Sequence, residues 1–249
     1  MKSKNERPLS DRQVEFFKEN GFLVLESFIE ESTIEIWRKR MWDFLEARPD
    51  RPETWDSEKY AISGFEFDPP DSAFGHLPQM RAVLEQLGEG EFQGGGGSPI
   101  IQWPREGEWQ IAESGHIDGY GPGGWSPFMF GATTYLYDVE PQGGGFTYWP
   151  GSHLTTWEYF LDHPKEIDGS FGGEGRPGQK IFSDLSPSGP VVFDAPAGDV
   201  VLWHSFLCHT GSPNIRSFPR MALFARYSHK LREEIRWEIP EDLWKYWAI

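Results

Sequence analysis

From Pro99 onward the chain consists of short apolar runs separated by turn-forming residues. The longest run, Phe128 to Val139, ends at Pro141-Gln142-Gly143-Gly144-Gly145, and Phe146 to Trp149 follows this turn. Short apolar runs bounded by Gly and Pro are typical of antiparallel strands. The 28 Gly and 20 Pro of the sequence supply many such turns. We therefore expect a mainly β fold with flanking helices.

The first ninety residues show helical patterns instead. Ser10 is a predicted helix N-cap and Gly21 a predicted stop, and the apolar residues between Ser27 and Ala47 recur at helical spacing. The predicted elements are a helix over 11–20, a strand over 22–25, a helix within 27–47, a helix over 76–87, a flexible break at 94–97, strands over 100–103 and 109–111, and long loops over 48–73 and 162–189.

The length of 249 residues predicts one domain with a sizeable core, spanning 1–249. Its helical part should cover about 9–90 and its β core about 98–230.

Charge and cysteine content narrow the possible partners. A formal net charge of −16 argues against nucleic acid and against anionic membrane, because both need clustered Lys and Arg. The single cysteine, Cys208, excludes an internal disulfide and fits a reducing compartment. The sequence shows no signal peptide or membrane span, so we expect a soluble, cytoplasmic protein.

The tripeptide His116-Ile117-Asp118 places two potential metal ligands one residue apart. In an extended strand these two side chains point the same way while Ile117 packs behind them. With a second histidine they would complete a 2-His-1-carboxylate facial triad. The alternative is a hydrogen-bonded pair at the mouth of a loop.

Three histidines are candidates for the missing ligand. His153 begins a predicted helix, where a histidine usually caps or packs, and His204 closes the apolar strand Val200 to Trp203, which favours a core position. His209 precedes a turn, and Arg220 lies eleven residues later at the start of the apolar run Met221 to Tyr227. A buried Arg needs an anionic partner, and a ligand carboxylate would satisfy it.

With these residues the sequence resembles the phytanoyl-CoA dioxygenase-like (PhyH-like) family of Fe(II)- and 2-oxoglutarate-dependent dioxygenases. The resemblance covers roughly Leu9 to Tyr227. It depends on the segment ending Gly21-Phe22-Leu23-Val24-Leu25, on His116-Ile117-Asp118, on Pro150-Gly151-Ser152-His153, and on His209 with Pro213, Asn214, Pro219 and Arg220.

The resemblance implies a double-stranded β-helix, a cupin-like jelly roll with helices packed on one side. It implies that His116, Asp118 and His209 hold iron and act as the catalytic centre, and that Arg220 binds the distal carboxylate of 2-oxoglutarate. The family often has a small hydroxyl residue two positions after the distal histidine, where this chain has Gly211. Ser212 stands one residue later, and Thr134 is a further candidate for binding the co-substrate.

The implied activity is hydroxylation of a small organic molecule with consumption of O2 and release of succinate and CO2. Chlorination is not expected, because Asp118 occupies the position that a halide would need. The sequence shows no basic cluster that could receive the phosphates of a CoA ester. Two alternatives stay open, a non-catalytic metal-binding jelly-roll module and a Zn-dependent hydrolase that uses the same three ligands. The sequence leaves the oligomeric state open.

Overall fold

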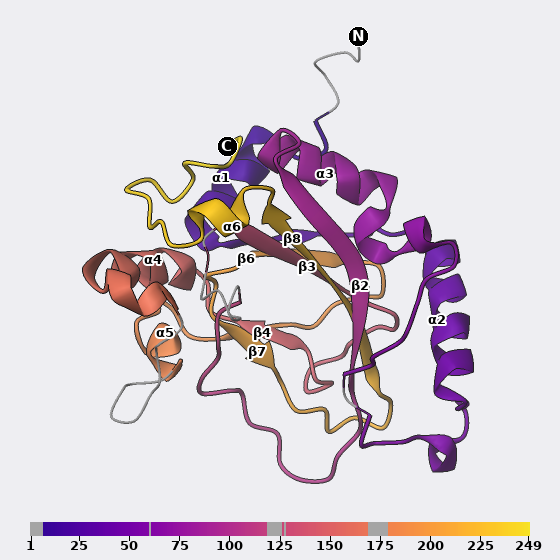
Figure 1. Ribbon diagram of the computed structural model, residues 1–249. Helices are drawn as coiled ribbons and strands as arrows, with labels where there is room; N and C mark the ends of the chain where they lie inside the picture. The colour runs from indigo at the N-terminus through magenta and orange to yellow at the C-terminus, as the bar shows by residue number, and fades with distance from the viewer. Residues whose placement is uncertain (1–6, 60, 119–125, 127, 169–178) are drawn as a thin grey trace.

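Two antiparallel sheets face each other in the computed structural model, which describes residues 7–59, 61–118, 126, 128–168 and 179–249 (Figure 1). The larger sheet has the strand order β1-β6-β3-β8-β2 and the smaller one β5-β4-β7. The strands are β1 (Phe22–Leu25), β2 (Phe92–Gln102), β3 (Met129–Tyr135), β4 (Phe146–Tyr148), β5 (Val191–Phe193), β6 (Val200–His204), β7 (His209–Gly211) and β8 (Arg220–His229). The helices are α1 (Asp11–Asn20), α2 (Glu31–Leu45), α3 (Pro78–Gly88), α4 (Ser152–Asp162), α5 (Lys180–Asp184) and α6 (Arg232–Ile235), with 3-10 turns at Pro52–Thr54, Pro70–Ser72, Phe74–His76 and Pro164–Asp168.

The larger sheet is buried on both faces, and successive residues of a strand face opposite sides. One face packs under the helices, where Tyr227 of β8 and Phe130 of β3 join Phe17 of α1 in one core cluster. The other face looks toward the smaller sheet, and there Phe224 and Trp203 pack with Phe146 of β4. The space between the sheets is therefore lined by even-numbered residues of β8, which include both Arg220 and Arg226.

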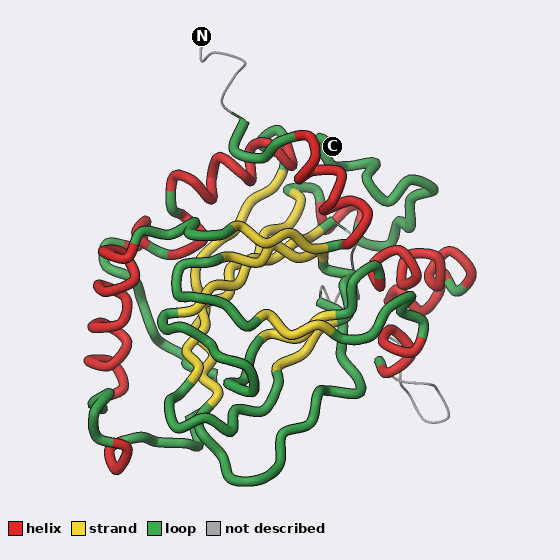
Figure 2. Tube along the Cα trace, turned by 180° about the vertical axis from the view of Figure 1, so that it is seen from behind, coloured by secondary structure: helices red, strands yellow, loops and turns green. Residues whose placement is uncertain are grey.

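The N-terminal elements follow the sequence prediction closely. Ser10 and Gln13 form a reciprocal capping box at the start of α1, and Gly21 ends the helix in a left-handed conformation with φ of 75°. Strand β1 pairs with β6, which brings the N-terminal segment to the edge of the larger sheet. Figures 1 and 2 show α1 and α3 along one side of this sheet, while α4 and α5 lie at one end of the molecule.

Three local predictions were wrong. Residues 94–97 are not a flexible break, because they belong to β2, which pairs with β8 and is bulged between Gly95 and Ser98. Residues 109–111 form no strand. The predicted loop over 162–189 contains α5 and the 3-10 turn at Pro164–Asp168. The chain after the turn at 141–145 enters β4, which lies in the smaller sheet and pairs with β5 and β7.

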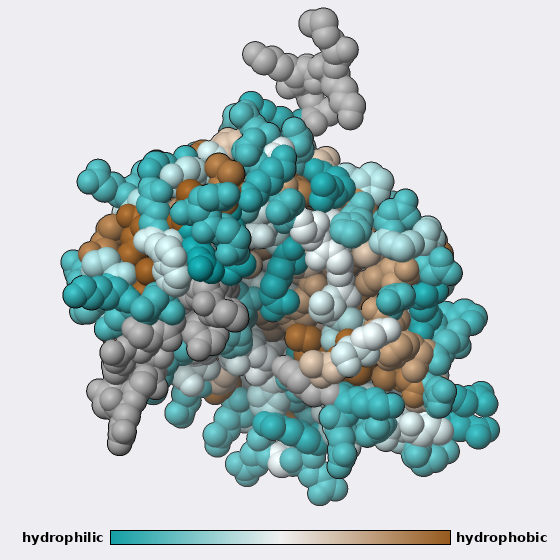
Figure 3. Space-filling model, viewed as in Figure 1, coloured by the Kyte–Doolittle hydropathy of each residue, from teal (hydrophilic) through white to brown (hydrophobic). Residues whose placement is uncertain are grey.

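Hydrophilic side chains cover much of the face shown in Figure 3, and apolar side chains gather near its middle. Across the described residues, no helix has both the length and the apolar character that crossing a membrane requires.

Candidate metal centre

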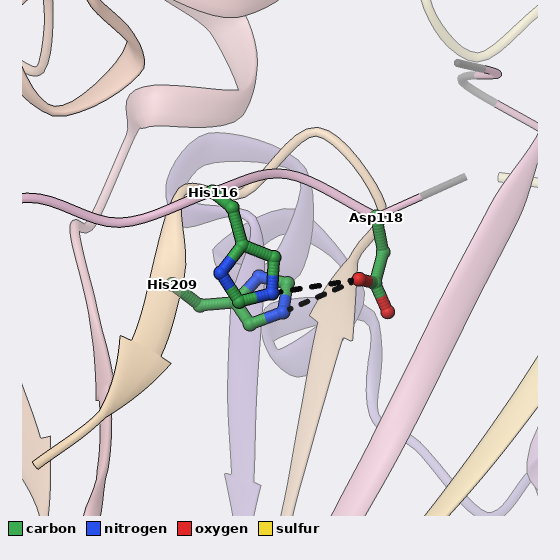
Figure 4. Close-up of side chains that lie close together, drawn as sticks. All are labelled: His116, Asp118 and His209. Carbon is green, nitrogen blue, oxygen red and sulfur yellow. Dashed lines mark ion pairs between the residues drawn. The ribbon is translucent and has the colours of Figure 1, made fainter. Parts of the chain in front are cut away.

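The side chains of His116, Asp118 and His209 converge on one point (Figure 4). Nε2 of His116 lies 3.8 Å from Oδ1 of Asp118, and Nε2 of His209 lies 3.7 Å from the same oxygen. One ligand atom from each residue lies within 4.8 Å of the other two. Two imidazoles and one carboxylate in this arrangement are the donor set of a facial metal site.

The backbone determines how these residues meet. His116 and His209 form an antiparallel bridge in which the N–H of each donates to the carbonyl of the other, at 2.9 and 2.8 Å. Ile117 is only 1% exposed, and its N–H donates to Oε1 of Gln179 at 3.0 Å. His116 and Asp118 therefore point to one side with Ile117 packed behind them, as the extended geometry predicted.

The ring of His209 is fixed in the form that a metal ligand needs. Its Nδ1–H donates to the carbonyl of Leu207 at 2.8 Å, so that Nε2 carries the free lone pair. The indole of Trp203 and the ring of Phe146 lie 4.8 and 5.2 Å from it, centroid to centroid. Burial lowers the pKa of His209 to about 4, and desolvation also lowers the pKa of His116. Both imidazoles are thus neutral at pH 7 and able to bind a metal ion.

Asp118 carries the negative charge of the centre. Burial by itself would raise its pKa, but His209 and Arg226 outweigh this effect and hold the pKa below its usual value. Nε of Arg226 donates to Oδ2 of Asp118 at 2.6 Å. The carboxylate therefore turns Oδ1 toward the two histidines and Oδ2 toward the guanidinium.

Arg226 is the residue of this centre that sequence reasoning missed. It stands in the apolar strand β8 and shares a face with Arg220, because the two positions differ by an even number of residues. A second arginine inside an apolar strand was the available signal. Its partner could not be predicted, since Asp118 is 108 residues away along the chain.

Arg220 begins β8 and is 3% exposed. Its Nε donates to the carbonyl of Gly144 at 2.7 Å and its Nη1 to the carbonyl of Ile100 at 3.1 Å. Its guanidinium carbon lies 6.0 Å from the centre of the Tyr135 ring. Arg220 is therefore buried in its strand, as the sequence predicted, and these contacts hold it at the start of β8.

The two hydroxyl candidates lie away from the three ligands. The hydroxyl of Thr134 donates to the carbonyl of Asp199 at 2.8 Å, and alternation along β3 places its side chain on the helix-covered face. Ser212 is buried, and its hydroxyl is hydrogen-bonded to that of Thr147 on β4. The structure brings neither residue into contact with His116, Asp118 or His209.

The other two histidines lie on the helix-covered face of the larger sheet. His204 follows Trp203 on β6, so its ring faces away from the metal centre and packs against Trp247, with the ring centroids 5.5 Å apart. His153 donates from Nε2 to the carbonyl of Lys18 at 2.9 Å and fills the space beside Gly21. The choice of His209 over both is therefore consistent with the geometry.

Residues 116–222 match the family model of phytanoyl-CoA dioxygenase (PhyH). No curated protein sequence matches the chain significantly.

Several solved structures share the fold at low sequence identity. The apo form of EctD from S. alaskensis is 20% identical with a TM-score of 0.61, and the match covers 92% of this chain and 80% of that one. The epimerase SnoN from nogalamycin biosynthesis, in complex with Fe3+, alpha ketoglutarate and nogalamycin RO, is 19% identical with a TM-score of 0.61, covering 88% and 83%. HygX from Streptomyces hygroscopicus, with nickel and 2-oxoglutarate bound, is 17% identical with a TM-score of 0.55, covering 89% and 88%.

These similarities confirm the jelly-roll fold class that the sequence predicted, with antiparallel sheets that do not close into a barrel. The segment that matches the family begins at His116 and includes Asp118, His209 and Arg220. Over residues 116–222 the chain is therefore similar to phytanoyl-CoA dioxygenase, and the solved structures show that it shares their fold.

Proposed function

We propose that this protein is an Fe(II)- and 2-oxoglutarate-dependent dioxygenase that hydroxylates a small organic molecule. The observation that carries the proposal is the convergence of His116, Asp118 and His209, whose ligand atoms lie within 4.8 Å of one another. The two imidazoles are neutral and the carboxylate is ionised at pH 7, because burial lowers both histidine pKa values and the surroundings of Asp118 lower its pKa.

The donor set fits Fe(II), and His116, Asp118 and His209 would hold it. Bound there with 2-oxoglutarate and O2, the metal would supply the oxidising chemistry that removes hydrogen from a substrate carbon, with conversion of 2-oxoglutarate to succinate and CO2. The same donors would also suit Zn, but a Zn hydrolase leaves Arg220 without a function.

Arg220 is proposed to bind the distal carboxylate of 2-oxoglutarate. A guanidinium presents a planar set of donors that matches a carboxylate, and the carbonyls of Gly144 and Ile100 orient it from two sides. The aromatic rings of Trp203 and Phe146 beside His209 limit the access of water to the metal centre. Ser212 and Thr134 are neutral and hydrogen-bond to Thr147 and to the carbonyl of Asp199, so Arg220 is the one of the three candidates with a charge to match a carboxylate.

Hydroxylation is favoured by the identity of residue 118. An aspartate at the third ligand position leaves no place for a halide, so the oxidised carbon should receive oxygen and not chlorine. The epimerase SnoN shows that a similar fold can direct the same chemistry to another outcome. Asp118 thus argues against chlorination, and hydroxylation is the outcome that we propose among the remaining oxidations.

We also propose that residues 1–249 act as one domain. Phe17 of α1, Trp37 of α2 and Leu84 of α3 share a core cluster with Phe130 and Tyr227 of the larger sheet. Removing the helical part would expose this apolar face to water, which is costly for a sheet of this size.

The test of the proposed function is the release of succinate from 2-oxoglutarate under O2 by the metal-free protein after reconstitution. Fe(II) should restore succinate formation, Zn should not, and His209→Ala should abolish it. His163→Ala is the matched control, because His163 is exposed and stacks on Tyr159 away from the centre. Equal succinate formation by the wild type and His209→Ala would contradict the proposal.

A further inference from the structure

The two oxygens of Asp118 have different neighbours. Oδ1 lies 3.8 and 3.7 Å from the Nε2 atoms of His116 and His209, whereas Oδ2 accepts a hydrogen bond from Nε of Arg226 at 2.6 Å. A carboxylate in this setting can offer a metal ion one oxygen while the guanidinium retains the other. The division between the two oxygens depends on Arg226.

Arg226 is itself held in place. Its guanidinium carbon lies 5.5 Å from the ring centre of Trp203 and 5.6 Å from that of Phe224. Its backbone pairs with Gly95, the residue at which β2 bulges. Stacking on two rings and a strand position opposite a bulge restrict how the side chain can move.

Arg226 cannot perform the task proposed for Arg220. The two residues lie six positions apart on one strand, which separates their Cα atoms by about 20 Å. Arg220 contacts the carbonyls of Gly144 and Ile100 at the far end of the space between the sheets. The strand therefore presents two arginines with separate tasks, one of them directed at a metal ligand.

We propose that Arg226 is a positioning residue that keeps Asp118 a ligand through Oδ1 only. This inference depends on the proposed function, because it assigns Arg226 a task toward the metal. If Oδ2 were released, the carboxylate could rotate away or bind through both oxygens. Binding through both oxygens would take up a coordination position that a facial triad leaves open for the co-substrate.

The sign of the effect separates positioning from electrostatics. A cation beside a metal ion repels it, so removing the charge of Arg226 should tighten metal binding if charge alone mattered. If Arg226 positions Asp118, its removal should weaken metal binding in spite of the lost repulsion. The ion pair is partly open to solvent, with side chains 40% and 16% exposed, so screening reduces the purely electrostatic part.

The experiment measures Co(II) binding to the metal-free full-length protein by its visible absorption, with and without 2-oxoglutarate. We expect Arg226→Met to raise the Kd for Co(II) about tenfold or more, the range typical for lost partners of metal ligands. We also expect the visible absorption of the Co(II)-loaded variant to differ from that of the wild type, and to change less when 2-oxoglutarate is added. Arg226→Lys keeps the charge but has a single donor group, so its Kd for Co(II) should lie between those of the wild type and Arg226→Met.

Arg236→Met is the matched control. Arg236 also stacks on an indole, that of Trp237 at 4.7 Å, and also forms an ion pair, with Glu233 at 3.1 Å, but it lies in the segment after β8. This variant should leave both the Kd and the absorption unchanged. Each variant is compared with the wild type after its melting temperature has been measured, and Arg226→Gln replaces Arg226→Met if the latter does not fold.

A double-mutant cycle gives the decisive result. If Arg226 acts through Asp118, Arg226→Met should change the Kd less than about twofold in an Asp118→Ala background. An equal loss in both backgrounds, or a wild-type Kd and spectrum in Arg226→Met, would overturn the assignment of Arg226. Failure of the wild type to bind Co(II), or to respond to 2-oxoglutarate, would instead overturn the proposed function and the inference that depends on it.

Discussion

His116 and His209 are hydrogen-bonded backbone partners as well as neighbouring side chains. Each donates its N–H to the carbonyl of the other, at 2.9 and 2.8 Å, and their ring centroids lie 4.5 Å apart. The segment with the first two ligands is thus attached directly to the strand that carries the third. Anything that opens this bridge should separate the ligands.

Gly115→Ala should open the backbone bridge between His116 and His209. A Cβ at Gly115 would lie 2.7 Å from the carbonyl oxygen of His209 and 2.8 Å from the ring of Trp149, distances that real Cβ atoms do not adopt. We expect metal affinity to fall roughly tenfold or more, as for other losses of support around a metal ligand. Gly189→Ala is the control, since nothing lies within 4 Å of a Cβ at that position. Isothermal titration with Fe(II) or Co(II) measures the metal affinity of both variants. Unchanged affinity in Gly115→Ala would show that the bridge does not hold the ligands together.

His153 should make stability depend on pH. Burial lowers its pKa to about 4 in the folded state, from about 6.5 in the unfolded state. Between these two values the unfolded state binds more protons than the folded state. The contribution of neutral, buried His153 to the free energy of unfolding is therefore complete above pH 6.5 and is lost as the pH falls toward 4. The contribution amounts to about 3 kcal/mol of unfolding free energy.

The measurement is denaturant unfolding of the wild type and His153→Gln at pH 7 and pH 4.5. The gap in unfolding free energy between the two proteins should narrow by about 2 to 3 kcal/mol at the lower pH. A gap of the same size at both pH values would contradict the role of burial at His153.

Arg220→Leu should affect 2-oxoglutarate far more than it affects iron. Loss of a charge-assisted pair worth about 1.5 to 3 kcal/mol should raise the 2-oxoglutarate concentration needed for half-maximal succinate release roughly 10- to 100-fold. Arg216→Leu is the control. Arg216 also donates to a backbone carbonyl, that of Pro141, but unlike Arg220 it is exposed. An unchanged 2-oxoglutarate dependence with unchanged iron loading would remove Arg220 from the site.

Local signals predicted the parts of the fold that local interactions determine. The cap at Ser10 and the left-handed Gly21 mark both ends of α1, and alternation at residues 116–118 places His116 and Asp118 on one side. Gly94 to Gly97 misled the prediction, because the local preference of glycine for flexibility is overridden by pairing with β8. Strand pairing is a long-range property that these residues do not encode by themselves.

The same limit applies to the centre. Whether His204 can reach the centre depends on which face of β6 looks toward the smaller sheet, where His209 of β7 lies. The sequence shows only that β6 is apolar throughout, which does not distinguish its two faces. The ion pair between Arg226 and Asp118 joins residues that are 108 positions apart. Motif and resemblance therefore pointed to the three side chains that converge, whereas the contact between Arg226 and Asp118 could not be predicted.

The wild type should not chlorinate its substrate. If Asp118 supplies the third ligand, as proposed, chloride has no position on the metal. Excess chloride with Fe(II), 2-oxoglutarate and O2 should then leave the hydroxylated product unchanged. Mass spectrometry of the products decides between the two outcomes. A chlorinated product from the wild type would show that Asp118 does not hold the metal during turnover.

We propose that His116, Asp118 and His209, and not His204, form an iron centre for a 2-oxoacid. The most direct measurement is the weak visible charge-transfer band that appears when Fe(II) and 2-oxoglutarate are added to the protein without O2. We predict the band in the wild type and in His204→Gln, and its loss in His209→Ala, with folding of all three proteins verified by circular dichroism. A band that persists in His209→Ala and disappears in His204→Gln would show that His204, and not His209, binds the iron.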